Sequence, residues 1–485
     1  MSAWRSAGRG DLLARVLEVG LVALLLGLPW FSWLGTTRPL PALSLFLAAL
    51  LFLLLVRAIR ERGAPLPVPA PLIPVGAFLA LVLLSMVPAP APLRRAVPEP
   101  SATEVPVGAG RGLAAVPELR APGRPLSLAP ERTRAELLRY AGLAAAFLLW
   151  ATLLGDAGRR RRFGWAAIAG GAVVALFGMI ERATADGRLF WSVPLPDHAQ
   201  PFGPYVNRNH FAGLLAPLLP FAVAALLDRW RLLRREMSAR ALLGAVARGA
   251  ELGLPLLTVA GFLLGTATVL SASRGGILAA AVGLMALGAL WGGSPGRRRR
   301  RGGVLLSVPL FLGTAWLGAP RTGERFLWEG TGDRWQVWTE ALPMFRDHPM
   351  VGIGAGAFAD VFPLYRESAG PHPVRFAHAE NEALELLVET GVVGTALLGA
   401  AAFLLLARAF RARRAGPVPW AATGALAALA AALAHALVDF NLHVPGNALL
   451  YAGLAALLWA ATPSSPRSAA GLASSSTVDG DPPGH

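Results

Sequence analysis

The sequence has no cysteine among its 485 residues and little charge, since only 15% of the residues are Asp, Glu, Lys or Arg. Without cysteine, disulfide bonds and thiolate metal sites are excluded. In place of charge the chain is apolar, with 54% hydrophobic residues and a mean hydropathy of +0.52. Soluble proteins of this length rarely reach such values, and repeated apolar runs of about 18 or more residues predict a membrane protein.

The net charge of +16 comes from 45 basic residues against 29 acidic ones. In a soluble protein such an excess would suggest nucleic acid as a partner. Here the basic residues gather in short loops between apolar runs, which is typical of cytoplasmic loops in membrane proteins. We therefore expect membrane lipids, and no nucleic acid, as partners. The first apolar run is followed directly by a second, so we interpret it as a retained helix and not as a removed signal peptide.

Apolar runs and basic loops together predict an all-α, polytopic membrane protein with about twelve transmembrane helices and both termini in the cytoplasm. The membrane domain is predicted to cover 1–461, and the Ser-, Gly- and Pro-rich tail 462–485 is predicted to be disordered. External loops are expected at 88–133, 181–210 and 321–383, the last being the largest. The predicted helices are 12–34, 40–59, 72–87, 135–154, 165–180, 211–227, 252–270, 277–291, 304–317, 384–410, 419–438 and 448–461.

Two arginines on the predicted outer face are candidates for binding phosphate. Arg274 lies between two apolar runs and precedes two glycines that let a ligand approach the backbone. Positive charge is biased toward the cytoplasm, so an outer arginine is better explained by a bound phosphate or pyrophosphate than by snorkelling. The same argument applies to Arg208, where the alternative is a solvated arginine beside Asn209 as a helix cap.

Polar residues directly before the predicted helix 384–410 are candidates for a catalytic base. They are His378, Glu380 and Asn381. A carboxylate or an imidazole at a helix N-terminus can take the proton from an acceptor hydroxyl. The alternative is that these residues only cap the helix, whose N-terminus favours negative charge. The glutamates that follow at helical spacing are interpreted as dipole partners and a polar helix face: Glu382, Glu385 and Glu389.

Further polar residues of the outer face are expected to contact sugar or to shape loops. Tyr205, Asn207 and Asn209 flank the first arginine, and their hydroxyl and amide groups suit sugar hydroxyls. Arg334 and Trp335 are expected either to contact the glycan or to shape the largest loop, with Arg334 in an ion pair. Polar groups from distant parts of the chain thus meet on one membrane face, as an active site built from helix ends requires.

Two other patterns are weaker evidence for a ligand site. The glycines of 352–356 resemble half of a dinucleotide-binding fingerprint, but no strand–helix–strand unit surrounds them, so we predict a close-packed turn. Near the C-terminus, His435, Asp439, Asn441 and His443 suit a metal by residue type. They span a helix end and a Pro-Gly turn, however, so packing and hydrogen bonding are the favoured interpretation. We expect no metal site and no cofactor.

These stretches resemble the O-antigen ligase and O-antigen polymerase family of bacterial membrane glycosyltransferases. The resemblance rests on residues 205–213, 273–275, 333–356 and 378–394, in this order, and residues 439–445 are similar to the end of the family's sequences. The family implies a GT-C-like architecture in the bacterial inner membrane. It also implies metal-independent transfer of a glycan from an undecaprenyl-pyrophosphate carrier at the periplasmic face. Arg208 and Arg274 match the arginines that hold the pyrophosphate.

The chain departs from the family at the proposed base. In the family, a histidine directly precedes an asparagine that stands ten residues ahead of a Gly-x-x-Gly. Here the asparagine is Asn381 and the glycines are Gly391 and Gly394, but Glu380 stands at the position of the histidine. Either Glu380 is the base, or His378 reaches the same point from two residues upstream.

The hypothesis that follows is an inverting displacement, in which a deprotonated acceptor hydroxyl attacks the anomeric carbon and the arginines stabilise the departing pyrophosphate. The acceptor is a lipid A core sugar, another glycan or a protein hydroxyl. The alternative function is a polysaccharide transporter or a lipid-linked glycan flippase. That alternative favours ionisable residues at mid-membrane, and the predicted helices have almost none.

Overall fold

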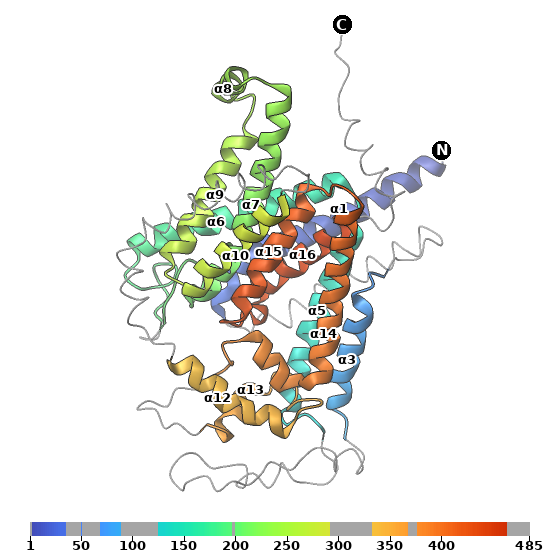
Figure 1. Cartoon of the computed structure of the whole chain (residues 1–485), viewed down its shortest axis with the longest axis vertical. Helices are drawn as coiled ribbons and strands as arrows, with labels where there is room; N and C mark the ends of the chain where they lie inside the picture. The colour runs from blue at the N-terminus through green and yellow to red at the C-terminus, as the bar shows by residue number, and fades with distance from the viewer. Residues whose placement is uncertain are drawn as a thin grey trace.

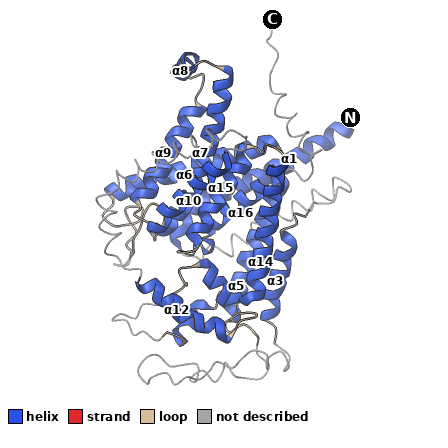
Figure 2. Cartoon of the chain, viewed as in Figure 1, coloured by secondary structure: helices blue, strands red, loops and turns tan. Residues whose placement is uncertain are grey.

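The computed structural model describes residues 2–34, 50, 68–88, 125–195, 199–291, 332–366 and 376–462. Within them the chain is helical, and the only β-structure is isolated bridges (Figure 2). Seven of the described helices are long and apolar enough to cross a membrane, and three further apolar helices are shorter. This confirms the predicted all-α, polytopic fold. The predicted helix 304–317, the predicted helix 40–59 apart from residue 50, and the tail from residue 463 lie outside the described residues.

The helices follow the predicted order along the chain. The first part comprises α1 (Ser2–Gly27) with its 3-10 continuation η1 (Leu28–Leu34), α3 (Leu72–Ser85), α5 (Pro130–Leu153), α6 (Ala157–Thr184), α7 (Arg208–Glu236), α8 (Ala239–Ala247), α9 (Gly253–Leu270) and α10 (Arg274–Trp291). The second part comprises α12 (Gly332–Asp347), α13 (Phe358–Val361), η4 (Phe362–Leu364), α14 (Glu382–Ala415), α15 (Trp420–Ala436), η5 (Asn441–His443) and α16 (Pro445–Ala461).

Helix α7 forms the centre of the bundle, because its apolar stretch is the most deeply buried among the seven candidate membrane helices. It packs against α9, α10 and α15 (Figure 1). A helix that is apolar all round has no solvent-facing side and is placed in a core. Its neighbour α15 is rich in alanine, and such small side chains let membrane helices approach closely. The amino end of α7, which begins at Arg208, is thereby held among three other helices.

Helices α3, α5 and α14 pack together beside this bundle and extend below it (Figure 1). Helix α14 contains a break at Gly391, whose φ of 63° and ψ of −169° are not helical. Below it lies the region predicted as the loop 321–383, which in its described part contains the helices α12 and α13. Apolar residues at helical spacing on α12 form a separate small core with α13 and the following turn: Val337, Ala341, Met344, Ile353, Phe358 and Phe362.

Several helices are longer than predicted because they continue beyond the apolar run. Helix α6 begins at Ala157, so Arg159 and the arginines after it lie in its first turns and not in a loop. Asp156 caps this end by accepting a 2.8 Å hydrogen bond from the Arg159 N–H. Helix α7 likewise starts three residues before the predicted Phe211 and runs nine residues past Leu227.

Candidate active site

The helix ends that carry the residues predicted on the outer face come together where the amino ends of α7, α10 and α14 meet the turn between α15 and α16 (Figure 1). A Cβ on Gly275, next to Arg274, would lie 2.9 Å from a ring atom of His435 on α15. A Cβ on Gly276 would lie against Ala212 of α7. The amino end of α10 therefore packs directly on the last turn of α15 and on the first turns of α7, and glycine is what allows the close approach.

Arg208 and Arg274 each begin a helix at this junction, and both are half-buried. Asn207, and not Asn209 as the capping alternative assumed, caps α7: its Oδ1 accepts the Asn209 N–H at 2.8 Å. Ser273 caps α10 by accepting the Gly276 N–H at 3.2 Å. Helix N-termini carry partial positive charge, so each arginine adds a full charge to a place that already favours anions.

Asp439 lies fully buried at the centre of the turn after α15. Its Oδ1 accepts the Phe440 N–H at 2.9 Å and its Oδ2 accepts the Asn441 amide at 2.8 Å. His210 and His435 place ring nitrogens 3.5 and 3.7 Å from the two oxygens. Burial alone would raise the pKa of Asp439, but the histidines and the N–H groups hold it well below its usual value. Asp439 is thus a buried, ionised carboxylate.

The asparagines of the turn tie it to α7 and to the segment before that helix. Asn447 donates to the Asn441 oxygen at 2.7 Å and to the His210 carbonyl at 2.8 Å. The Tyr205 hydroxyl donates to Asn447 at 2.9 Å and is buried. Tyr205 was predicted to bind sugar hydroxyls, but its own hydroxyl is occupied inside the protein, so its contribution is to hold the turn.

Glu380 lies directly before Asn381, the cap of α14, with a side chain 25% exposed. Its φ of 55° is unusual for a residue other than glycine, and backbone strain of this kind is often found at functional sites. Its Oε2 lies 3.3 Å from the guanidinium of Arg334 on α12. Burial and the charge of Asp439 raise the pKa of Glu380, against the opposing effect of Arg334 and His210, to about 7. A group with this pKa can both accept and release a proton near neutral pH.

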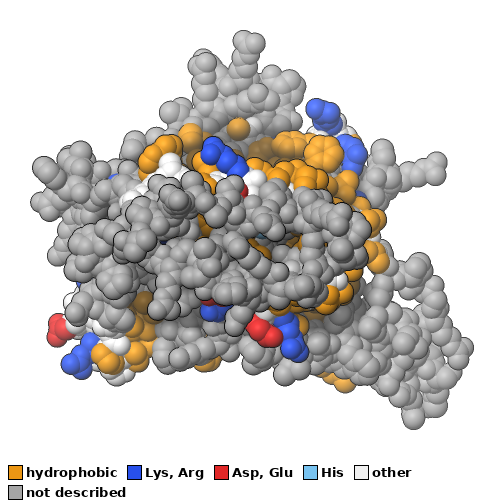
Figure 3. Space-filling model, turned by 90° about the horizontal axis from the view of Figure 1, so that it is seen from below, with side chains coloured by type: hydrophobic (Ala, Val, Ile, Leu, Met, Phe, Trp, Pro, Cys, Tyr) orange, Lys and Arg blue, Asp and Glu red, His pale blue; other side chains and the backbone are white. Residues whose placement is uncertain are grey.

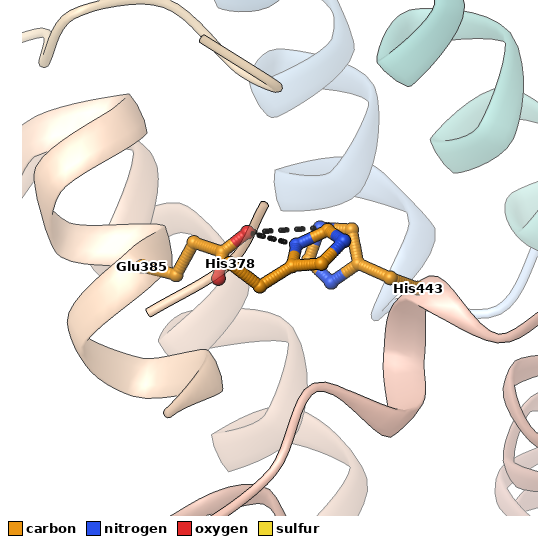
Figure 4. Close-up of side chains that lie close together, drawn as sticks. All are labelled: His378, Glu385 and His443. Carbon is orange, nitrogen blue, oxygen red and sulfur yellow. Dashed lines mark hydrogen bonds and ion pairs between the residues drawn. The ribbon is translucent and has the colours of Figure 1, made fainter. Parts of the chain in front are cut away.

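His378 lies deeper and is engaged within the protein. Its Nδ1 is hydrogen-bonded to the Glu385 carboxylate at 2.7 Å, and its ring stacks on Phe440 with centroids 4.1 Å apart. His443 approaches the same carboxylate at 3.6 Å (Figure 4). Burial and Arg139 lower the pKa of His443, but Glu382 and Glu385 outweigh them and raise it to about 9.

Asn381 caps α14, because its Oδ1 accepts the Leu384 N–H at 3.0 Å.

The three side chains of Figure 4 have the residue types of a metal site, and their ligand atoms lie within 4.8 Å of one another. Two ligands of one tetrahedral zinc ion stand about 3.3 Å apart, given bonds of about 2.0 Å. His378 and Glu385 are closer, at 2.7 Å, which is the distance of a hydrogen bond. The positive Arg139 also approaches this group. The geometry fits an ion-paired cluster better than a metal centre.

Arg139 and Glu136 on α5 belong to this cluster although the sequence analysis did not single them out. They form an ion pair, and Arg139 Nη1 donates to the Leu442 carbonyl at 2.7 Å. Glu382 accepts the Leu442 N–H at 2.5 Å. The available signal was Arg139 itself, an ionisable residue inside the predicted apolar helix 135–154, which is rarely placed there without a partner.

The glycine-rich segment 352–356 is a packed turn, and its partner is the break in α14. The N–H groups of Ile353 and Gly354 donate to the carbonyls of Val388 and Glu389 at 3.1 and 3.0 Å. The Glu389 side chain accepts the Phe358 N–H at 3.0 Å. Glutamates that the sequence analysis interpreted as a polar helix face are therefore buried and bonded to neighbouring segments. This turn fixes the direction in which α14 leaves the site.

Trp335 and Trp338 lie on α12, the helix whose Arg334 pairs with Glu380. Trp338 donates its Nε1–H to the Ala379 carbonyl at 2.9 Å, which ties α12 to the segment that carries the carboxylate. Trp335 meets Trp338 edge-on and is 66% exposed. Figure 3 views this end of the molecule, where described hydrophobic side chains are interspersed with a few arginine and acidic side chains. Trp335 thus offers an exposed aromatic ring on α12, the helix whose Arg334 pairs with Glu380.

With this geometry in place, the comparison with known families identifies part of the chain. Residues 259–399 match the family model described as O-antigen ligase. This part of the chain is similar to the O-antigen ligase family. The match confirms the resemblance inferred from the sequence, and it includes Arg274, Arg334 and Glu380 but neither Arg208 nor the turn at Asp439. A search of curated proteins finds no match. The family supports a glycan-transfer role in O-antigen or lipopolysaccharide assembly for a multi-pass membrane protein.

Proposed function

We propose that the protein is a membrane glycosyltransferase that moves a glycan from an undecaprenyl-pyrophosphate carrier to an acceptor hydroxyl. The observation that carries this proposal is the place of Glu380, which lies inside the O-antigen ligase match, directly before the cap of α14, and pairs with Arg334. It stands where the family pattern has its histidine, and the amino ends of α7 and α10 at the same junction carry two candidate phosphate-binding arginines.

The donor's pyrophosphate is assigned to Arg208 and Arg274. Each arginine begins a helix, so its guanidinium and the helix end favour the same charge. Arginine also binds phosphate oxygens in a bidentate manner. Negative charge grows on the pyrophosphate as the sugar leaves, and groups that meet this charge in place stabilise the transition state. The donor's sugar would then project toward Glu380 and α12.

The reaction is a single displacement at the anomeric carbon. Glu380 accepts the proton of the acceptor hydroxyl, and the hydroxyl oxygen forms a bond to the anomeric carbon. The bond from that carbon to the pyrophosphate oxygen breaks, and its electrons remain on the leaving pyrophosphate. Attack from the opposite side inverts the configuration. Glu380 takes up the proton, and Arg208 and Arg274 stabilise the charge on the pyrophosphate, so no step requires a metal ion.

Glu380 is preferred to His378 as the base because of their surroundings. The Nδ1 of His378 is committed to Glu385, and its ring is stacked on Phe440. Glu380 is more exposed, and its pKa suits a base at neutral pH. His378 then supports the segment that carries Glu380. Asn207 and Asn381 act as helix caps, and Asn209, Arg334 and Trp335 are assigned to the glycan side of the site.

The site is assigned to the periplasmic face of the bacterial inner membrane. Arginine-rich helix ends lie at the other end of the bundle, in the first turns of α6 and the last turns of α7 and α14, together with the start of α1 and the helix α8 (Figure 1). Loops rich in arginine stay in the cytoplasm. The acceptor is a lipid A core sugar or a growing glycan, as carrier-linked donors are used on the outer side.

The test is glycan transfer by purified protein in liposomes. Undecaprenyl-pyrophosphate glycan is supplied with lipid A core, a second carrier-linked glycan or a protein acceptor in turn, with and without EDTA. The proposal predicts transfer to one acceptor, unaffected by EDTA. Carrier binding without transfer to any acceptor, together with movement of the carrier across the bilayer, would instead identify a flippase.

A further inference from the structure

A groove lies between the first helix α1 and the helix α6, which pack against each other. Its volume of about 900 Å³ is in the range of sites that hold small molecules. Three arginines line it: Arg15 on α1, and Arg159 and Arg162 in the first turns of α6. These residues lie at the arginine-rich end of the bundle, opposite the candidate active site, so the groove is a separate feature of the molecule.

Two acidic side chains also line the groove, but both are engaged within the protein. Both oxygens of Glu18 accept hydrogen bonds from Arg162, at 2.6 and 2.9 Å. Asp156 accepts the Arg159 N–H at 2.8 Å as the cap of α6. The Arg159 side chain lies 3.6 Å from Glu18, which is beyond hydrogen-bond range. Three positive charges against two engaged negative ones leave this end of the groove with an excess of positive charge.

Further along the two helices the groove is apolar. Val19, Val22 and Leu26 line it from α1 at helical spacing, and Ala166 lines it from α6. The side chains of Val19 and Leu26 are 66% and 37% exposed. The stretch from Val19 to Leu26 extends about 10 Å along the helix, given 1.5 Å per residue. Both helices are candidate membrane spans, so this apolar part lies at the depth of lipid chains.

We propose that the groove binds an anionic phospholipid of the cytoplasmic leaflet, with the phosphate at Arg15 and Arg159 and an acyl chain along the apolar wall of α1. The groove has the polarity of such a lipid, because it is positively charged at one end and apolar toward the membrane interior. Basic pockets between membrane helices on the cytoplasmic side bind acidic lipid headgroups. Arginine also suits phosphate, since its planar fork of N–H groups binds two oxygens at once. This site does not depend on the proposed glycan transfer.

The experiment uses the absence of cysteine from the chain, because a single introduced cysteine can then be labelled without interference. Ala23→Cys places a fluorophore in the groove, since Ala23 lines it and is exposed. Val259→Cys on α9 is the matched control. Val259 is 55% exposed on another candidate membrane span and does not line the groove.

The labelled full-length protein is placed in vesicles that mix phosphatidylcholine with phosphatidylglycerol, one of the two brominated so that it quenches the fluorophore. Comparing the quenching by the two lipids gives the preference of each position for the anionic one. At Ala23→Cys we expect a preference of about fivefold, the effect of one basic residue near the membrane surface. At Val259→Cys we expect no preference. Equal preference at both positions would overturn the proposal, and so would the absence of a preference in the groove.

Removing the charges gives the second arm of the test. Arg15→Gln together with Arg159→Gln should abolish the preference measured at Ala23→Cys. Arg182→Gln, in the last turn of the same helix α6, should leave it unchanged. A preference that survives the double variant would overturn the proposal. If the double variant does not fold, Arg15→Gln alone is measured, because Arg15 is exposed, and it should lower the preference.

Arg162 is left in place in these variants, because Glu18 would otherwise lose its hydrogen-bond partner. The quenching measurement needs no glycan donor and no acceptor. Failure to transfer glycan would therefore count against the proposed function alone, and the absence of a lipid preference would count against the groove alone.

Discussion

The Nδ1 of His378 lies 2.7 Å from the Oε1 of Glu385, a carboxylate that is 2% exposed. The sequence offered His378 and Glu380 equally as candidates for the base, and this hydrogen bond distinguishes between them. The second oxygen of Glu385 accepts the Ala379 N–H at 2.8 Å, so both partners hold the segment that leads to Glu380. We interpret His378 as part of the support of the site and Glu380 as its reacting group.

Replacing His378 tests this division of roles. His378→Gln should keep measurable transfer and lose stability, because a buried carboxylate without its partner costs about 1–3 kcal/mol. The measurement is thermal unfolding in detergent together with the transfer rate. If the variant unfolds like the unmodified protein but loses all transfer, His378 is the base and Glu380 is not.

Removing Arg274 should abolish most of the transfer while the protein still inserts and folds. Loss of one group that stabilises a developing negative charge costs on the order of 10²–10³ in rate. Arg274→Ala is compared with Arg182→Ala, since Arg182 is exposed in the last turn of α6, away from the junction. Equal rates in the two variants would contradict the assignment of Arg274 to the pyrophosphate.

The contact between the glycine-rich turn and α14 predicts a stability effect. Gly391 has a φ of 63°, and a Cβ there would lie 2.3 Å from the Met350 carbonyl carbon. Gly391→Ala should therefore destabilise the protein by more than about 3 kcal/mol, through strain and the forced separation of the two segments. The control is Gly399→Ala on the same helix, where a Cβ would meet nothing within 4 Å. Similar yields of folded protein for both variants would argue against this packing.

Trp335 should matter for the glycan and not for folding, since it is 66% exposed and follows Arg334, which pairs with Glu380. Trp335→Ala is expected to raise the acceptor KM roughly tenfold, about 1.4 kcal/mol, with kcat little changed. Trp335→Phe keeps an aromatic face and should recover most of the loss. The comparison is Trp191→Ala, an exposed tryptophan bonded to Thr184 at the end of α6. A fall in kcat alone would indicate that Trp335 shapes the loop and does not bind sugar.

The helices could be predicted because the apolar runs are long and the basic clusters mark one side. Their ends could not, because helices such as α6 and α7 continue past the membrane, where charged residues are compatible with a helix. Asp156 and Asn207 mark the true starts as caps. The small helical core around α12 was missed, since its apolar residues are few and widely spaced within a polar segment.

The residue types at the site could be read from the sequence, but their roles depend on contacts between distant segments. Tyr205 was expected at the sugar and is bonded to Asn447 instead. Asp439 was interpreted as packing and hydrogen bonding, and it is a buried carboxylate that also contacts His210 on α7. The sequence analysis did not single out Arg139, which bonds to the Leu442 carbonyl. These partners lie more than two hundred residues away along the chain, beyond what local spacing can reveal.

The central claim is tested most directly by the transfer rate of Glu380→Gln beside that of the unmodified protein, in liposomes with undecaprenyl-pyrophosphate glycan and an acceptor. Glutamine keeps the size of the side chain and cannot accept the proton. We predict carrier binding without transfer in this variant, and recovery of part of the rate in Glu380→His, which introduces the family's histidine. Full transfer by Glu380→Gln would contradict the account.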